Sequence, residues 1–213
     1  MSTKLYLLDL RTYQNGMWRS LMNELPEDRQ ARVLACRFDP DRARIAGGGW
    51  LLRHALEQNG IPAAQQRFSK NPWGKPELQN GPHFSLSHGG LLAVCATSDH
   101  PIGVDAELPR CTMAIARRYF RPEELEGLDL QPSFAQMNSL NRIWTAKEAF
   151  TKALGQGTAM PLNSFTVRLS ADGAVLEQDL STLPYRLHEY QEGPCRICLC
   201  TTDDKPELEY VTK

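Results

Sequence analysis

The sequence predicts an α+β fold built from two similar halves, with a ligand site at their interface. A strand, a group of helices and a run of strands occur once over residues 1–100 and again over residues 101–213. The 213 residues are 41% hydrophobic and 23% charged, a balance typical of globular chains that bury a sizeable core. Because ligands favour clefts between packed units, we expect the site to lie between residues 1–100 and residues 101–213.

Charge and apolar patterning argue against several classes of protein. The formal net charge is -1 at pH 7, whereas dedicated nucleic-acid binders are usually strongly basic. No apolar run approaches the roughly 18 residues of a membrane-spanning helix, and no secretory signal opens the chain. We therefore expect a cytoplasmic protein without nucleic-acid or membrane partners.

The six cysteines predict neither a zinc site nor a redox site. Cys195, Cys198 and Cys200 are clustered, but a tetrahedral zinc site needs a partner pair that the sequence lacks. Cys198 and Cys200 fit one face of a strand, where a free cysteine packs as a small hydrophobic side chain.

Turn and capping residues divide the first half into elements. The expected elements are a buried strand at 4–10, helices at 17–25, 28–37 and 39–59, a loop at 61–82 and a hairpin at 83–97. Asp39 is the expected N-cap of the third helix, with Pro40 in its first turn. Glycines 47–49 are costly inside a helix, so we expect either close approach of a ligand or backbone, or a tight helix crossing. Ser87 and His88 fall at the end of the hairpin.

The second half repeats the order of strand, helices and strands. Its expected elements are a strand at 102–107, helices at 112–120, 122–128 and 136–154, strands at 164–170, 174–177, 184–190 and 195–201, and a polar tail from residue 203. Gly155 marks the end of the long helix, and Gly173 and Gly193 mark hairpin turns.

Acidic and basic side chains recur at spacings that place them on common faces. Asp105 and Glu107 are two residues apart in a strand, so both side chains leave the same face. Trp144, Glu148 and Lys152 recur every fourth residue and share one face of the long helix. Three carboxylates make a plausible site for a hard cation such as Mg²⁺, and Lys152 could reach a phosphate bound to it. Separate surface ion pairs are the alternative.

Further basic groups could hold an anion near these acids. Lys75 lies on a stiff turn between glycine and proline, and Arg44 and His88 are further candidates. A metal, basic groups and a diphosphate together make a phosphoryl-transfer site. Ser87 and His88 do not indicate a hydrolase, because neighbours in a strand point opposite ways and no nucleophile-elbow pattern is present.

Four motifs, in order and properly spaced, resemble those of the 4′-phosphopantetheinyl transferases of the surfactin-synthetase-activating (Sfp) type. Gly74-Lys75-Pro76 is similar to the family's Gly-Lys-Pro, and Phe84-Ser85-Leu86-Ser87-His88 is similar to its Phe-Asn-x-Ser-His. Gly103-Val104-Asp105-Ala106-Glu107 matches Gly-x-Asp-x-Glu. The stretch 144–152 matches Trp-x-x-Lys-Glu-Ala-x-x-Lys. The resemblance runs nearly end to end, and the length suits the monomeric two-half type.

The resemblance implies that coenzyme A donates its phosphopantetheine arm to a serine of an apo acyl or peptidyl carrier protein, releasing 3′,5′-ADP. It implies Mg²⁺ held by Asp105, Glu107 and Glu148, diphosphate bound by Lys152, and coenzyme A held by Arg44, Lys75, Ser87 and His88. It places the adenylate and 3′-phosphate side in residues 1–100, and the acids and catalytic helix in residues 101–213. The base for the acceptor hydroxyl stays open between Glu148, Glu124 and a metal-bound water.

Two features concern binding beyond these motifs. Asp28 stands where some relatives carry a phosphate-binding lysine, so Arg29 or Arg32 is expected to substitute. The candidate dock for an acidic carrier helix is the basic and aromatic patch of Arg117, Arg118, Tyr119, Phe120 and Arg121. A helix face packed by its own aromatic residues is the alternative.

Two residues of the long helix have roles that the resemblance leaves open. Trp144 is expected to anchor the helix at the interface of the two halves, and Lys147 to face a phosphate or solvent. A non-catalytic protein that binds coenzyme A or a carrier is the alternative function, and a magnesium-dependent phosphohydrolase is a third. The transferase is favoured because Asp105, Glu148 and Lys152 are present together with Glu107.

Overall fold

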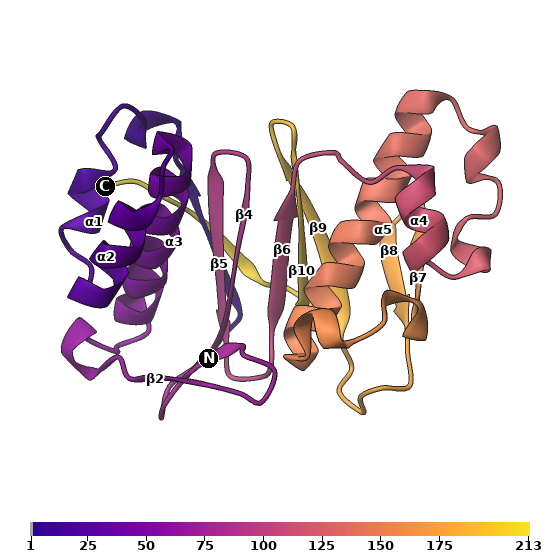
Figure 1. The fold of residues 1–213 in the computed structure, drawn as a ribbon. Coiled ribbons are helices and arrows are strands. Elements are labelled where there is room, and N and C mark those ends of the chain that lie inside the picture. Colours follow the sequence, from indigo (N-terminus) through magenta and orange to yellow (C-terminus); the bar gives the residue numbers. More distant parts are fainter. Residues whose placement is uncertain (1) are drawn as a thin grey trace.

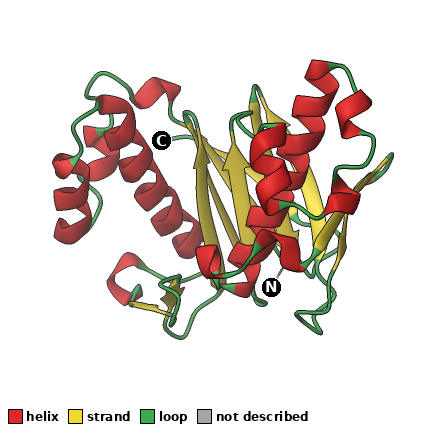
Figure 2. Ribbon diagram, turned by 45° about the vertical axis from the view of Figure 1, so that its right-hand side comes forward, coloured by secondary structure: helices red, strands yellow, loops and turns green. Residues whose placement is uncertain are grey.

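The computed structural model describes residues 2–213 and has the expected α+β architecture (Figures 1 and 2). Strands fill the middle of the molecule, helices α1 to α3 lie on one side of them, and α4 and α5 lie on the other. The helices are α1 (Arg19–Met22), α2 (Glu27–Ala35), α3 (Asp39–Gln58), α4 (Met113–Tyr119) and α5 (Ser133–Leu154). The strands are β1 (Lys4–Asp9), β2 (Phe68–Lys70), β3 (Pro76–Leu78), β4 (His83–Gly89), β5 (Leu92–Ser98), β6 (Gly103–Glu107), β7 (Thr166–Ser170), β8 (Gly173–Glu177), β9 (Arg186–Glu192), β10 (Cys195–Thr201) and β11 (Glu207–Val211).

The last strand of the chain joins the sheet of the first half. The two main sheets have the orders β11-β1-β5-β4 and β6-β10-β9, and β11 pairs with β1 in parallel. Figure 1 shows the yellow end of the chain crossing to the side of α1 to α3. The polar tail expected from residue 203 is therefore wrong over residues 207–211. This edge strand is mostly exposed, so its sequence lacks the apolar pattern that predicts a strand.

Two serine hydroxyls join the sheets where β4 meets β6. Ser85 Oγ accepts a hydrogen bond from the backbone N–H of Val104 at 3.0 Å, and Ser87 Oγ accepts one from Ala106 at 3.2 Å. Gly89 continues the close approach, since a Cβ there would lie 3.0 Å from the backbone nitrogen of Glu107. The seam between the halves is thus held by side chains rather than by a ladder of backbone hydrogen bonds.

Helix α5 packs directly on β6, and this contact fixes which of its residues face the seam. A Cβ on Gly103 would collide with the backbone carbonyl of Ala149, so helix and strand approach at glycine distance. On another face of the helix, Phe150 is fully buried against Phe165 and Tyr185. Gly155 ends the helix in a left-handed conformation, with φ of 73°, as its sequence predicts.

Some expectations for the first half need correction. Asp39 is the first residue of α3 and not its N-cap, because its carboxylate accepts hydrogen bonds from Gly16 N–H and Trp18 Nε1–H. Two of the three glycines lie against leucine side chains. Gly47 lies against Leu10 and Gly49 against Leu25, whereas a Cβ on Gly48 would meet no other part of the protein within 4 Å. The approach of a ligand to this run stays a prediction. Within residues 2–213, no helix is long and apolar enough to cross a membrane.

Candidate active site

A cavity of about 410 Å³ lies between α3 and α5, over the seam of β4 and β6. Its walls combine basic side chains from the first half with acidic side chains from the second. The residues that line it are Arg29, Arg32, Arg44, Ile45, Gly48, Gly49, Leu86, Ser87, His88, Asp105, Glu107, Arg110, Glu148 and Lys152. The structure therefore brings together most of the side chains that the sequence singles out.

Asp105, Ser87 and Lys152 form a closed triangle at the centre of the cavity. Lys152 Nζ donates to Asp105 Oδ1 at 2.7 Å and to Ser87 Oγ at 2.9 Å. The Ser87 hydroxyl donates to the same Asp105 oxygen at 2.9 Å. The second carboxylate oxygen, Asp105 Oδ2, is buried and has no hydrogen-bond partner among the described residues. A buried oxygen without a partner is costly, so the site favours a cation or a donor at that position.

Glu107 and Glu148 lie beside this triangle, and its charged groups shift their pKa values. Burial raises the pKa of Glu107 above its ordinary value, the charge of Asp105 raises it further, and Arg110 lowers it. Burial and the charge of Asp105 also raise the pKa of Glu148, while Lys152 and Arg110 lower it. The carboxylates thus lie close enough to repel one another, as expected where a cation would be held.

The acids suit a hard cation chemically but are not arranged as a ready-made cluster. Carboxylate oxygens are the ligands that Mg²⁺ prefers, and the unpartnered Asp105 Oδ2 faces no competing donor. However, residues 2–213 contain no group of three His, Cys, Asp or Glu side chains close enough to hold a metal ion. Two cations stand beside the acids instead, Lys152 at Asp105 and Arg110 at Glu107.

The basic wall of the cavity is formed by α2, α3 and the end of β4. Arg44 pairs with Asp41, while burial and the like charge of Arg32 lower the pKa of Arg29. The pKa of His88 is also lowered, mainly by burial and further by the charges of Arg44 and Lys152. Cations that repel one another around a cavity make a favourable position for a phosphate. The side chains of Arg29 and Arg32 both line this cavity, so the substitution expected for Asp28 remains open to either of them.

Lys75 does not lie in this cavity. Its ammonium donates to the carbonyl oxygens of Ile102 at 2.9 Å and Lys152 at 2.6 Å, and so joins the end of α5 to the residue before β6. Burial lowers the pKa of Lys75 to about 8. The structure places it in the wall of a neighbouring cavity, as a tie between two backbone segments rather than beside Arg44 and His88.

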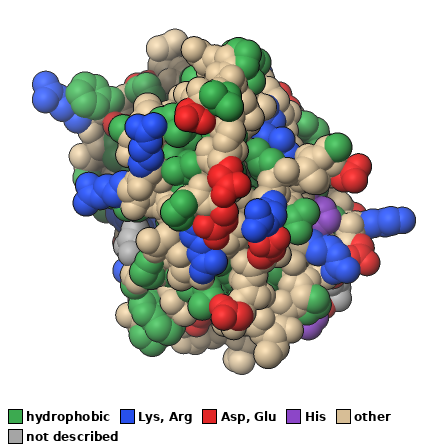
Figure 3. Space-filling view, turned by 90° about the vertical axis from the view of Figure 1, so that its right-hand side faces the viewer, with side chains coloured by type: hydrophobic (Ala, Val, Ile, Leu, Met, Phe, Trp, Pro, Cys, Tyr) green, Lys and Arg blue, Asp and Glu red, His purple; other side chains and the backbone are tan. Residues whose placement is uncertain are grey.

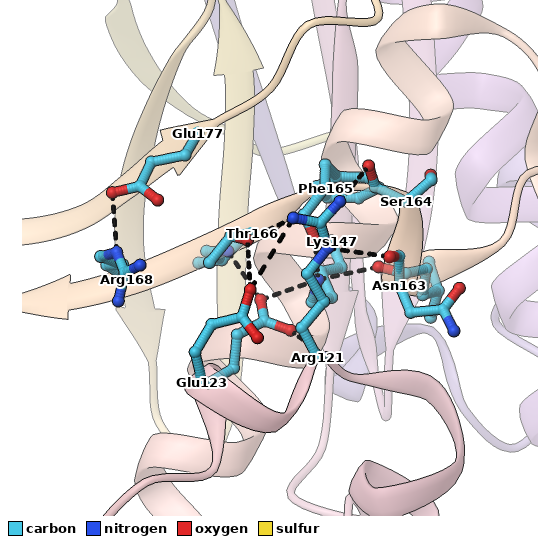
Figure 4. Close-up of polar contacts among 12 residues, drawn as sticks. Arg121, Glu123, Lys147, Asn163, Ser164, Phe165, Thr166, Arg168 and Glu177 are labelled. Atoms are coloured by element: carbon cyan, nitrogen blue, oxygen red, sulfur yellow. Dashed lines mark hydrogen bonds and ion pairs between the residues drawn. The ribbon is translucent and has the colours of Figure 1, made fainter.

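Glu124 is not placed where it could take a proton from a substrate. Its side chain is fully buried, with one oxygen 2.7 Å from Lys147 Nζ, and it accepts backbone hydrogen bonds from Arg121 and Val167. Lys147 is equally buried and also donates to the carbonyl of Phe165 at 2.8 Å (Figure 4). Glu124 as base and Lys147 as a phosphate or solvent contact are therefore both wrong. The pair is a hydrogen-bonded ion pair in the interior of the second half.

The expected carrier-docking patch is divided by the structure. The guanidinium of Arg121 turns inward and donates to the carbonyls of Asn163 and Ser164 (Figure 4). Phe120 is only 4% exposed. The exposed members are the remaining three, Arg117, Arg118 and Tyr119.

Trp144 lies within the second half and not at the interface of the halves. Its ring contacts Tyr119 and Phe120, with centroids 6.0 Å and 6.3 Å away. These two rings belong to α4 and the residue after it, so Trp144 anchors α5 to α4. The indole Nε1 is buried and has no hydrogen-bond partner among the described residues.

Two parts of the site were missed by sequence reasoning. Arg110 lies three residues beyond Glu107 and belongs to no motif, although a basic residue so soon after the acidic pair was a signal. A second cavity of about 450 Å³, lined by Trp73, Pro76 and Phe84, adjoins the first and shares Leu86 and Lys152 with it. Only the folded structure shows that Arg110 lines the first cavity and that the two cavities adjoin.

Comparisons with known proteins identify the family of this chain. A family model described as the 4′-phosphopantetheinyl transferase superfamily matches residues 101–200, which include Asp105, Glu107, Glu148 and Lys152. The 4′-phosphopantetheinyl transferase psf-1 of Bacillus pumilus is 33% identical over 208 residues, which cover 93% of this chain and 89% of the relative. The 4′-phosphopantetheinyl transferase Sfp of Bacillus subtilis is 33% identical over 174 residues, covering 78% of each chain. The chain belongs to the 4′-phosphopantetheinyl transferase superfamily.

Removing one charge of the buried pair should destabilise the protein strongly. Glu124→Gln leaves the Lys147 ammonium buried without its carboxylate, and we expect a loss of about 3–5 kcal/mol in the free energy of unfolding. The double substitution Glu124→Leu with Lys147→Met should recover most of that loss. Urea unfolding followed by circular dichroism measures both. Glu177→Gln in the exposed pair with Arg168 is the matched control and should change little; an equal loss there would contradict the assignment.

The buried ammonium of Lys75 should make stability depend on pH. Its folded pKa of about 8 lies below the ordinary lysine value, so the unfolded chain binds more protons between these two values. Stability from this group therefore rises as pH increases from about 8 to about 10. Relative to Lys75→Met, the free energy of unfolding of the wild type should rise by about 2 kcal/mol over that pH range, measured by urea unfolding. Parallel pH profiles of the two proteins would show that Lys75 is not buried as a cation.

Proposed function

We propose that this protein transfers the 4′-phosphopantetheine arm of coenzyme A to a serine of an apo acyl or peptidyl carrier protein. The observation that carries the proposal is the cavity in which Arg29, Arg32 and Arg44 face Asp105 and Lys152 across the seam. Coenzyme A carries a 3′-phosphate and a diphosphate, which need a basic pocket and a separate site of charge neutralisation. The relatives named above are transferases of this kind.

The two adjoining cavities offer one position for each part of the donor. The basic wall with His88 suits the 3′-phosphate, and the acidic end with Lys152 suits the diphosphate. The second cavity suits the adenine, because the ring of Trp73 and the apolar Phe84 and Leu86 can pack on a purine. The donor would then lie along the seam, held by both halves.

The catalytic contributions follow from the groups around the diphosphate. When Mg²⁺ is bound, Asp105, Glu107 and Glu148 would hold it, and it would neutralise charge on the diphosphate. The Lys152 ammonium would donate to the diphosphate and stabilise the charge that develops on the departing 3′,5′-ADP. Glu124 is buried with Lys147, so of the two side chains expected as base only Glu148 lines the cavity where it could accept the proton of the acceptor serine.

The carrier would dock on the exposed part of α4. Arg117 and Arg118 offer positive charge to an acidic helix, and Tyr119 is 38% exposed beside them. Figure 3 shows this side of the molecule, where Lys and Arg side chains alternate with Asp and Glu side chains. Docking is therefore expected to depend on these few positions rather than on a broad basic field. A monomeric, cytoplasmic enzyme without nucleic-acid or membrane partners stays a prediction.

The decisive test is the mass of an apo carrier protein after incubation with the protein, coenzyme A and Mg²⁺. We expect an increase equal to one phosphopantetheine group, which Asp105→Asn should slow at least about 100-fold because a charge at the reacting centre is lost. Asp172→Asn, in the exposed turn between β7 and β8, is the control and should react normally. Binding of coenzyme A without any transfer would favour the alternative, a non-catalytic binding module.

Charge reversal on α4 tests the carrier dock. Arg117→Glu with Arg118→Glu should raise the KM for the carrier about tenfold and leave the KM for coenzyme A unchanged, because these side chains lie outside the donor cavity. Arg168→Glu, in a surface ion pair on β7, is the matched control. Equal changes in both KM values would place the carrier elsewhere.

A further inference from the structure

Arg110 combines a backbone held by hydrogen bonds with an exposed side chain at the edge of the cavity. The backbone N–H groups of Arg110 and Cys111 both donate to Asn141 Oδ1, at 2.9 Å and 3.0 Å. Asn141 belongs to α5 and is only 1% exposed, so this anchor is firm. The Arg110 side chain is 66% exposed and its guanidinium pairs with Glu107. It can change partner without any movement of the backbone.

Arg110 and Lys152 are the two cations that neutralise the acids. Lys152 pairs with Asp105 at 2.7 Å, and Arg110 pairs with Glu107. The charge of Arg110 reaches Glu148 as well. Any divalent cation that takes these carboxylates releases both basic side chains, and each then needs a new anion. The donor diphosphate is the anion that the proposed function brings to this position.

The position of Arg110 identifies which phosphate it meets. The adenine cavity adjoins the site through Leu86 and Lys152, so the adenosine side of the donor lies at the Asp105 end. Glu107 is two residues further along β6, about 6–7 Å from Asp105 and away from Gly103, where α5 makes its close contact. Arg110 therefore borders the phosphate that is farther from the adenosine.

We propose that Arg110 is a donor-binding residue that exchanges Glu107 for the phosphoryl group being transferred. This inference rests on the proposed function, because it requires coenzyme A in the cavity. The exchange is favourable because an exposed ion pair contributes little, whereas a guanidinium can form two parallel charge-assisted hydrogen bonds with a phosphate. Lys152 stays with the phosphate that leaves, so the two cations divide the diphosphate between them.

Calorimetric binding of coenzyme A and of 3′,5′-ADP, both with Mg²⁺, tests the exchange directly. The second ligand lacks the phosphoryl group that Arg110 would hold. Arg110→Ala should weaken the binding of coenzyme A about tenfold and the binding of 3′,5′-ADP less than about twofold. The affinity of Arg110→Lys for coenzyme A should fall between those of the wild type and Arg110→Ala. Arg196→Ala is the matched control, since Arg196 lies opposite Glu107 in the sheet but bonds to Asn138. It should bind both ligands as the wild type does.

Titration of the donor-free protein with Mn²⁺ gives a second readout. Arg110→Ala should bind Mn²⁺ about two- to fivefold more tightly, because a competing cation has been removed from Glu107. If Arg110→Ala weakened the binding of coenzyme A and of 3′,5′-ADP equally, or weakened neither, the proposal would be overturned. A rise in the carrier KM alone would also overturn it and assign Arg110 to the dock. Failure of the wild type to bind coenzyme A would overturn the proposed function itself.

Discussion

The contact among Ser87, Asp105 and Lys152 is the interaction on which the rest of the site depends. It joins β4 of the first half to β6 and α5 of the second, and it sets the distance between the basic and acidic walls. Asp105 is 3% exposed, and the ammonium and hydroxyl replace the water that burial removes from one of its two oxygens. The same contact holds Lys152 where a diphosphate would need it, so the folded structure prepares the site before a donor arrives.

Much of the fold and site could be predicted from local patterns. The two-residue spacing of Asp105 and Glu107 and the helical spacing of Glu148 and Lys152 fix directions that the structure keeps. These four side chains and His88 line one cavity over the seam. Such predictions succeed because the direction of each side chain depends on its own element.

The misplaced residues are those whose environment is set by distant parts of the chain. The sequence offers Glu124 as a base and Lys147 as a phosphate or solvent contact, yet each is buried because the other one and the backbone near Phe165 satisfy it. Lys75 donates to two carbonyls, one of them at the end of α5, and lines the second cavity instead of the one with Arg44 and His88. The strand at 207–211 forms because β1 offers an unpaired edge. No local pattern carries this information.

The pairing of β1 with β11 also affects how the chain folds while it is being synthesised. Lys4 meets Glu207 across this pairing, so nearly the whole chain separates two neighbouring strands. On the ribosome, β1 can pair with β5 early, but its other edge stays open until residues 207–211 emerge. An open strand edge is a template for pairing with other chains, so we expect the nascent first half to be prone to aggregation until that edge is covered. The same strand that completes the sheet thus makes the folding of the first half wait for the end of the second.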